Sequence, residues 1–286
     1  MTYTVEFCER EYNNRLLVPD YATHFERWAR LGLEFRQRHQ TRPGTRLDSL
    51  YAETPNASLD YFSCGQGQAP LFVFIHGGYW RSLDKNDFSW IAAPFLDARV
   101  DVALLNYALC PHVQIDQIVQ QMRQACGWLV RHADGLGFDP HRITIGGHSA
   151  GAHLAAMLSC THWSEWDRDL PNDLVKASLL ISGLYDLEPL LWAPFVNQDL
   201  RLDAGSAARL SAAYLPPLEH CRVITAVGGL ESNEFKRQNQ LIAKHWPQNL
   251  IADVPMPDTN HFTVVDALAD PSNPLTAKAL ELCLSA

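Results

Sequence analysis

A serine lies at the centre of the segment Gly147-His148-Ser149-Ala150-Gly151. This G-x-S-x-G pattern follows a strand-like run ending at Ile145 and precedes a helical pattern over 152–158. Small residues on both sides allow a serine to occupy a sharp turn between a strand and a helix with its hydroxyl exposed. We therefore predict that Ser149 is a nucleophile. The alternative is an ordinary glycine-rich turn in which Ser149 only caps the helix.

A second segment that could take part in a reaction is His76-Gly77-Gly78-Tyr79-Trp80, which follows the apolar run 71–75. Backbone N–H groups of such a loop, with that of the residue after the nucleophile, can bind the oxyanion of a tetrahedral intermediate. We predict that Gly77, Gly78 and Ala150 are these donors and that His76 braces the loop. Tyr79 and Trp80 adjoin the loop and are predicted to contact the substrate. The alternative is a simple turn with a buried histidine.

A serine hydroxyl needs a base to take its proton, and in proteins with this pattern the chain order is serine, acid, histidine. His261 fits because its loop, 257–262, follows the last strand-like run and precedes a short helical pattern over 264–268. The other histidines beyond Ser149 lie too near it in sequence or beside predicted elements: His153, His162, His220 and His245. We predict that His261 is the base.

Two carboxylates follow predicted strands in the window where the acid is expected. They are Asp186, after the run 177–181, and Glu231, after the run 223–227. Either residue type can hold an imidazole in one tautomer. Glu231 is favoured because it follows the penultimate strand, next to the loop of His261, and Asp186 is then expected to fix a turn or cap a helix.

The elements that must position these residues form an α/β pattern. A predicted hairpin over 47–52 and 58–63 is followed by strand-length apolar runs that alternate with helical patterns, which is typical of a mostly parallel sheet. These runs are 71–75, 100–105, 143–145, 177–181, 223–227 and 250–254. The clearest helix, over 115–132, carries a broad apolar stripe suited to packing on that sheet.

We expect the 286 residues to form a single domain. Residues 5–40 are predicted to be an N-terminal helical extension, with Phe25, Trp28, Leu31, Leu33 and Phe35 on one face. If that face were exposed, it would favour a homodimer. The aromatic segments 160–173 and 187–215 are expected to be cap-like helical insertions over the active site.

Five segments resemble kynurenine formamidases, also called arylformamidases, over most of the chain beyond the N-terminal helix. They are HGGYW at 76–80, GHSAGAHL at 147–154, SGLYDLEPL at 182–190, ESNEFKRQ at 231–238 and NHF at 260–262. The resemblance implies an α/β-hydrolase fold, an oxyanion hole in the H-G-G-x-W loop and an acid before the Ser-x-Glu-Phe run, which is Glu231 here. Animal and fungal members carry Asp at that position.

The resemblance also implies hydrolysis of N-formyl-L-kynurenine to L-kynurenine and formate, as part of tryptophan catabolism. Because the family contains esterase-like members, a carboxylesterase for small acyl or aryl esters is the alternative. No metal or organic cofactor is required for either reaction. Aromatic residues near predicted loops could line a pocket for a flat aryl group: Tyr79, Trp80, Trp163, Trp166, Trp192, Phe195 and Phe262.

The net charge is −9, and Lys and Arg are scattered, so neither nucleic acid nor an anionic membrane is an expected partner. The first residues carry acids where a secretory signal needs a basic start and an apolar run, and a cytoplasmic protein is therefore expected. Seven cysteines without a C-x-x-C pair argue against a disulfide framework or a zinc site. Most of them are expected to be reduced and buried.

Overall fold

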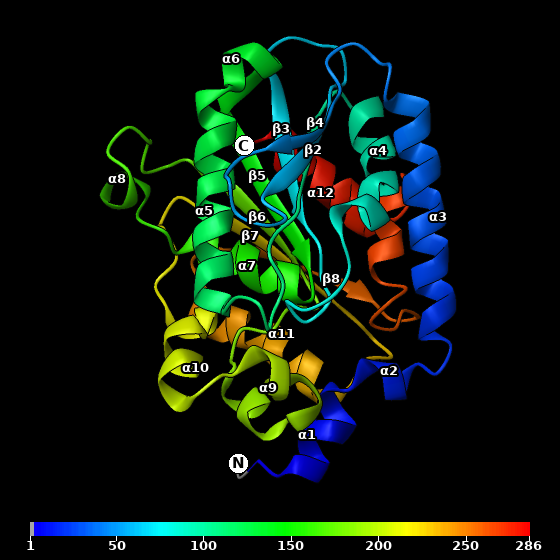
Figure 1. The fold of residues 1–286 in the computed structure, drawn as a ribbon, viewed down its shortest axis with the longest axis vertical. Coiled ribbons are helices and arrows are strands. Elements are labelled where there is room, and N and C mark those ends of the chain that lie inside the picture. The colour runs from blue at the N-terminus through cyan, green and yellow to red at the C-terminus, as the bar shows by residue number, and fades with distance from the viewer. Residues whose placement is uncertain (1–2) are drawn as a thin grey trace.

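The computed structural model describes residues 3–286 and has one eight-stranded sheet at its centre (Figure 1). Its order is β1-β2-β4-β3-β5-β6-β7-β8. β2 runs antiparallel to β1 and β4, and all pairs from β4 to β8 are parallel. The strands are β1 (Arg46–Leu50), β2 (Ser58–Phe62), β3 (Ala69–Ile75), β4 (Asp101–Leu105), β5 (Phe138–His148), β6 (Ala177–Ile181), β7 (Arg222–Gly228) and β8 (Leu250–Met256). The predicted opening hairpin and mostly parallel sheet are confirmed.

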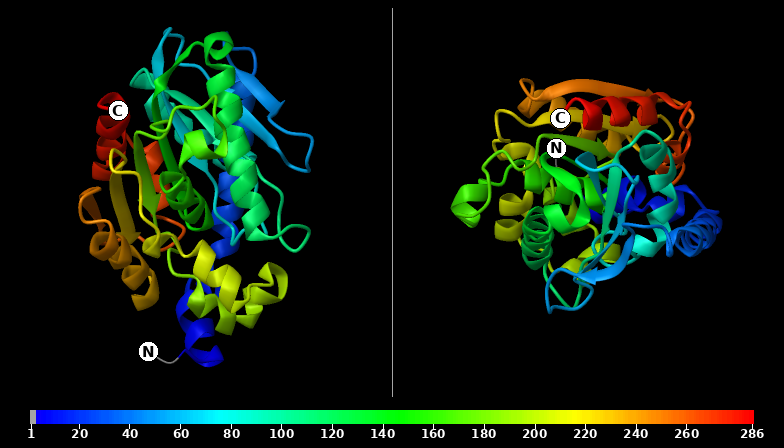
Figure 2. Two further views of the ribbon diagram at one scale, coloured as in Figure 1. Left: turned by 90° about the vertical axis from the view of Figure 1, so that its left-hand side faces the viewer. Right: turned by 90° about the horizontal axis from the view of Figure 1, so that it is seen from above.

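Helices cover both faces of this sheet (Figure 2). They are α1 (Val5–Tyr12), α2 (Asn14–Leu17), α3 (Tyr21–His39), α4 (Ala92–Asp97), α5 (Ile115–Arg131), α6 (Ala133–Leu136), α7 (Ala150–Ser159), α8 (Trp163–Trp166), α9 (Pro194–Leu200), α10 (Ala204–Leu210), α11 (Asn233–His245) and α12 (Pro274–Leu284). Short 3-10 helices are η1 (Lys85–Ile91), η2 (Glu188–Trp192), η3 (Ala212–Tyr214) and η4 (Val265–Ala269).

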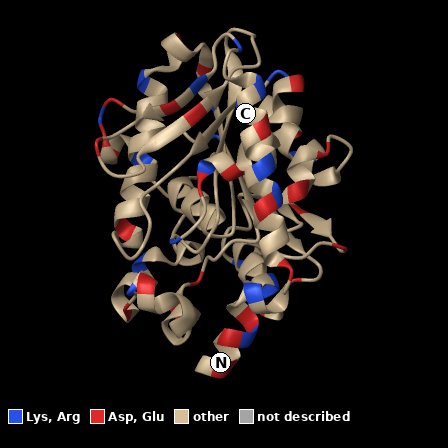
Figure 3. Ribbon diagram, turned by 45° about the vertical axis from the view of Figure 1, so that its right-hand side comes forward, with Lys and Arg blue, Asp and Glu red and all other residues tan. Residues whose placement is uncertain are grey.

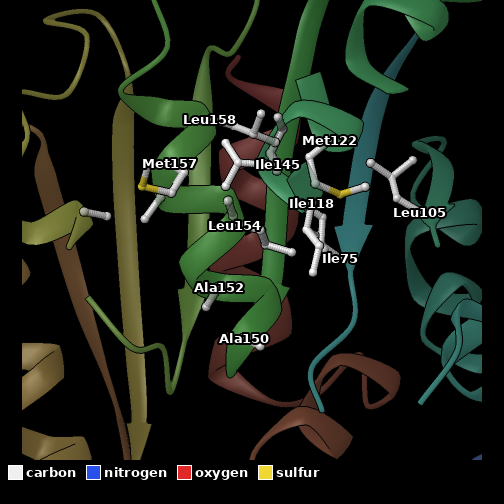
Figure 4. Packing of buried hydrophobic residues seen from close by; sticks show 14 of the residues in the cluster. Ile75, Leu105, Ile118, Met122, Ile145, Ala150, Ala152, Leu154, Met157 and Leu158 are labelled. Atoms are coloured by element: carbon white, nitrogen blue, oxygen red, sulfur yellow. The ribbon is translucent and has the colours of Figure 1, made fainter. Parts of the chain in front are cut away.

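Two hydrophobic cores form because side chains of the strands alternate between the two faces. In β3, Val73 and Ile75 point into the core under α5 and α7, whereas Phe72 and Phe74 point into the core under α3, α4 and α12. Figure 4 shows the first core, where Leu154 of α7 lies near the strands. Because both faces are buried, β3 is apolar along its whole length, as the sequence shows.

The N-terminal segment forms three helices rather than one. Trp28 and Phe35 of α3 are buried, and Trp28 Nε1 donates a hydrogen bond to Asp266 Oδ1 at 3.0 Å. Leu33, predicted on the same face, is instead 56% exposed. The helical period explains this difference, since residue 33 lies well off the line through 28, 32 and 35. The apolar stripe of α3 is covered by the chain itself.

The two predicted insertions lie in different places. Residues 187–215 form η2, α9, α10 and η3, beside α1 at the end of the sheet where the parallel strands terminate (Figure 1). Residues 160–173 instead pack beside α5, where Trp166 Nε1 donates to Gln120 Oε1 at 3.0 Å and Arg131 pairs with Asp167. Residues 160–173 therefore differ from the prediction and do not cover the candidate site.

Positions of Lys and Arg are interspersed with those of Asp and Glu along the ribbon in Figure 3. Across residues 3–286, none of the helices combines the length and the apolar character that crossing a membrane requires. All seven cysteines are free thiols, and only Cys64 and Cys160 are partly accessible.

Candidate active site

Ser149 occupies the turn between β5, which ends at His148, and α7, which begins at Ala150. Its backbone has φ 56° and ψ −120°, a conformation that costs a non-glycine residue about 1–3 kcal/mol and often marks a functional position. The turn is fixed by the Ser149 N–H, which donates to the carbonyl of Ile181 at 2.9 Å. A Cβ on Gly151 would lie 2.0 Å from the Ile75 carbonyl oxygen, so only glycine allows α7 to approach β3 this closely. The local geometry is therefore that of a sharp strand-to-helix turn with Ser149 at its apex.

His261 and Glu231 lie beside this serine, although 112 and 82 residues separate them from it in sequence. The Ser149 Oγ is 3.0 Å from His261 Nε2, and His261 Nδ1 is 2.6 Å from Glu231 Oε2. All three residues are buried. Because a carboxylate only accepts hydrogen bonds, the proton of the neutral ring lies on Nδ1, which leaves Nε2 free to accept from the serine hydroxyl.

Glu231 is held by two further donors on its other oxygen. Oε1 accepts hydrogen bonds from the Ser182 hydroxyl at 2.5 Å and the Gly228 N–H at 2.7 Å. Asp186, the alternative acid, instead pairs with Arg237 at 3.0 Å. Its Oδ1 also accepts from the Glu188 N–H at 3.3 Å, which is the turn-fixing contact expected if Asp186 is structural. The carboxylate that meets His261 is therefore Glu231.

The loop after β3 has an unusual backbone, with positive φ at three consecutive residues: Gly78 at 103°, Tyr79 at 51° and Trp80 at 55°. The Gly78 carbonyl accepts hydrogen bonds from the N–H groups of Arg81 and Ser82, both at 3.1 Å. These turn contacts fold the loop back beside Ser149, and both Gly78 and Ser149 line the same pocket.

The side chains of His76 and Tyr107 brace this loop by contacts with its backbone carbonyls. His76 Nδ1 lies 2.8 Å from the Gly77 carbonyl oxygen, and Nε2 lies 3.0 Å from Asn106 Oδ1. The Tyr107 hydroxyl donates to the His76 and Gly77 carbonyls at 2.9 and 3.1 Å. Because burial lowers the pKa of His76, this ring is suited to bracing the loop rather than to exchanging protons.

A pocket opens over Ser149 between the loop, the N-terminal helices and α9. Its lining comprises Asn13, Asn14, Arg15, Phe25, Trp28, Gly78, Tyr79, Arg81, Ser82, Leu83, His148, Ser149, Phe195, His261 and Phe262. Of the aromatic residues predicted from sequence, it contains Tyr79, Phe195 and Phe262. Helix α3 contributes two more, Phe25 and Trp28, which the sequence did not indicate because their spacing matched an ordinary core stripe.

Trp80 does not line this pocket, and the prediction that it contacts substrate is wrong. Its side chain is fully buried and packs edge-on against His153, with ring centroids 5.0 Å apart. The reversal of the backbone at positions 79 and 80 turns Trp80 into the core while Tyr79 faces the pocket. Trp163 is likewise buried, and Trp192 is exposed away from the pocket.

His148 is a member of the site that sequence analysis missed. It occupies the variable position of G-x-S-x-G, lines the pocket, and its Nε2 donates to the His261 carbonyl at 2.8 Å. Burial, together with the neighbouring His261, lowers the pKa of His148 well below its ordinary value. This neutral ring therefore fixes the backbone of the base, and the five-residue pattern alone gave no signal of it.

Comparison with known proteins gives consistent results. A family model described as BD-FAE matches residues 61–182. The chain is similar to kynurenine formamidases of Danio rerio, at 30% identity over 83% of this chain and 82% of that one, and Salmo salar, at 31% identity with the same coverages. It also resembles the crystal structure of a candidate thioesterase from Silicibacter, with a TM-score of 0.81, 32% identity and coverages of 93% and 96%.

Proposed function

The chain belongs to the kynurenine formamidase family of α/β-hydrolases, and from that premise we propose that it hydrolyses N-formyl-L-kynurenine to L-kynurenine and formate. Its broader class is a serine hydrolase of the arylformamidase and esterase type. The observation that carries the proposal is the continuous hydrogen-bonded series Ser149, His261 and Glu231, of which Ser149 and His261 line an aromatic pocket.

In the proposed first step, His261 Nε2 takes the proton of the Ser149 hydroxyl as Oγ attacks the formyl carbon. The imidazolium that forms is stabilised by Glu231, whose Oε2 already accepts from Nδ1. Burial of all three groups keeps bulk water from competing for these hydrogen bonds.

The tetrahedral intermediate carries its negative charge on the former formyl oxygen. We assign its stabilisation to the N–H groups of Gly77, Gly78 and Ala150. Support for Ala150 is its position as the first residue of α7, where an N–H has no partner within the helix and the helix dipole favours an anion. Support for the two glycines is the bracing of their loop beside Ser149.

Collapse of this intermediate breaks the C–N bond, and His261 Nε2–H protonates the departing arylamine. A formyl ester of Ser149 remains. Water then attacks this ester while His261 again takes a proton, and formate leaves as Ser149 Oγ is reprotonated. The aromatic rings of Tyr79, Phe195 and Phe262 offer contacts for the aryl ring of the leaving group.

A second candidate is hydrolysis of small acyl or aryl esters, because the chain is also similar to the carboxylic ester hydrolase LipN of Mycobacterium tuberculosis, at 36% identity over 34% of this chain. The same residues would act, but the group left on Ser149 would be the acyl group of the ester, and the leaving group would be an alcohol or phenol.

Steady-state kinetics of the wild type and Ser149→Ala on N-formyl-L-kynurenine and on a short-chain p-nitrophenyl ester test both candidates. The formamidase proposal expects a kcat/KM higher by orders of magnitude for the formamide and no turnover by the variant. Turnover of the ester alone would retain the mechanism and replace the substrate.

A further inference from the structure

The candidate pocket differs in charge from the rest of the protein. The chain carries a net charge of −9, yet the pocket lining includes Arg15 and Arg81 and no Asp or Glu. A cationic lining in an acidic protein favours an anionic group on the ligand.

The two arginines are not equivalent. Arg81 already pairs with Asp199, whose Oδ2 lies 2.5 Å from Nη1. Arg15 has no carboxylate within 4.0 Å among residues 3–286, and its guanidinium lies over the rings of Tyr21 at 5.3 Å and Phe25 at 5.7 Å. The aromatic faces orient this cation without neutralising it, and Phe25 itself lines the pocket.

Asn14 provides an independent sign of a ligand beside Arg15. Its side chain is only 5% exposed, it lines the pocket, and its amide nitrogen is buried without a hydrogen-bond partner among the described residues. A buried donor left unpaired is unfavourable by about 1–3 kcal/mol, so such groups are usually satisfied by a ligand or water.

Contacts of α1 fix the chain at Tyr12, two residues before Asn14. Burial raises the pKa of the Tyr79 hydroxyl, which stays protonated and donates to the Tyr12 carbonyl at 2.6 Å. The Tyr12 hydroxyl in turn donates to Glu234 Oε2 at 2.6 Å. Two hydrogen bonds therefore join the end of α1 to the loop after β3 and to α11. Figure 1 shows α1 beside α11.

We propose that Asn14 and Arg15 form an anion subsite that selects aryl substrates bearing a carboxylate away from the scissile bond. This inference rests on the proposed function for its substrate, because N-formyl-L-kynurenine carries such a carboxylate on its amino-acid side chain. The guanidinium supplies the charge and the Asn14 amide a directional donor.

The test compares pairs of substrates that differ only in the carboxylate. One pair is N-formyl-L-kynurenine and its α-carboxamide, and the other is 3-(4-acetoxyphenyl)propionate and its amide. Arg15→Gln is expected to lower kcat/KM about tenfold to hundredfold for the two carboxylates, mainly through KM, and to cause no such loss for the two amides. Asn14→Asp, which places a like charge beside the substrate, should produce the same selective loss.

Arg10→Gln is the matched control, since Arg10 lies on α1 with its side chain 65% exposed and is not part of the pocket lining. Arg10→Gln should leave kcat/KM unchanged for all four substrates. Arg15→Lys should recover part of the carboxylate preference because it restores the charge but not the fork of donors. Raised salt should narrow the preference of the wild type.

Equal losses of kcat/KM on the carboxylates and on their amides, or no loss on either, would overturn the anion subsite. If neither formamide is hydrolysed but the acetoxy pair shows the Arg15-dependent preference, the formamidase proposal fails and the subsite stands. If both formamides are hydrolysed and Arg15→Gln does not discriminate between them, the formamidase stands and the subsite fails.

Discussion

Glu231→Gln is the substitution that most sharply tests the hydrogen-bonded series at the active site. Glu231 presents two oxygens to three donors: Oε2 to His261 Nδ1, and Oε1 to the Ser182 hydroxyl and the Gly228 N–H. Glutamine has nearly the same shape but replaces one of these oxygens with an NH2 donor. Both orientations of the amide are therefore unfavourable.

If the NH2 faces His261, it meets the Nδ1–H and favours the tautomer with its proton on Nε2, which cannot accept from Ser149. If it faces Gly228, two buried donors oppose each other at a separation of about the present 2.7 Å. Loss of the correct tautomer lowers kcat by about 10⁴-fold in a serine protease, equivalent to about 5.4 kcal/mol of transition-state stabilisation. We expect a fall in kcat of about 10³- to 10⁴-fold here.

The assay is steady-state turnover of the preferred substrate by wild type, Glu231→Gln and Glu231→Asp, with thermal unfolding to verify that each protein is folded. Aspartate keeps the charge but shortens the side chain, so Glu231→Asp should lower kcat by about tenfold to hundredfold because His261 is misplaced. Asp186→Asn is the matched control, because it removes a carboxylate that pairs with Arg237 instead.

A Glu231→Gln variant that keeps more than about a tenth of wild-type kcat would refute the tautomer argument. If Asp186→Asn shows the large fall in its place, Asp186 would be the acid.

Other parts of the structure give three further predictions. Gly78→Ala should lower kcat/KM by at least about a hundredfold, because Gly78 has φ 103° and the new Cβ would lie 2.1 Å from the Ser82 carbonyl oxygen; kinetics with a correction for folded protein checks this. Trp80→Ala should lower the free energy of unfolding by about 3–5 kcal/mol in denaturant titrations, whereas Phe195→Ala should chiefly raise KM for aryl substrates by about threefold to tenfold. Burial lowers the pKa of His153 from 6.5 to about 4, so this histidine binds a proton in the unfolded chain at a higher pH than in the folded protein. The free energy of unfolding should therefore fall by about 3 kcal/mol as the pH drops from 6.5 to 4. Urea titrations of a His153→Gln variant should lack this part of the decline.

The sequence alone predicted which residues form the hydrogen-bonded series at this site, because short local patterns mark their positions. The glycines around Ser149 reflect a turn that only small residues permit, and the order of serine, acid and histidine favoured His261 and left Glu231 and Asp186 as candidate acids. Its place after the penultimate strand favoured Glu231, and the structure brings Glu231 to His261. Strand-length apolar runs identified the parallel sheet because both of its faces are buried.

The tertiary structure decided which side chains share the pocket. Phe25 and Asn14 reach it because α2 and α3 fold back over the loop after β3, and no local pattern encodes that return. The sequence placed Trp80 in the pocket wrongly, because the positive φ angles of Tyr79 and Trp80 determine whether its ring enters the core or the pocket. Local backbone requirements can be inferred from residue types, whereas contacts between segments far apart in the chain depend on how whole elements pack.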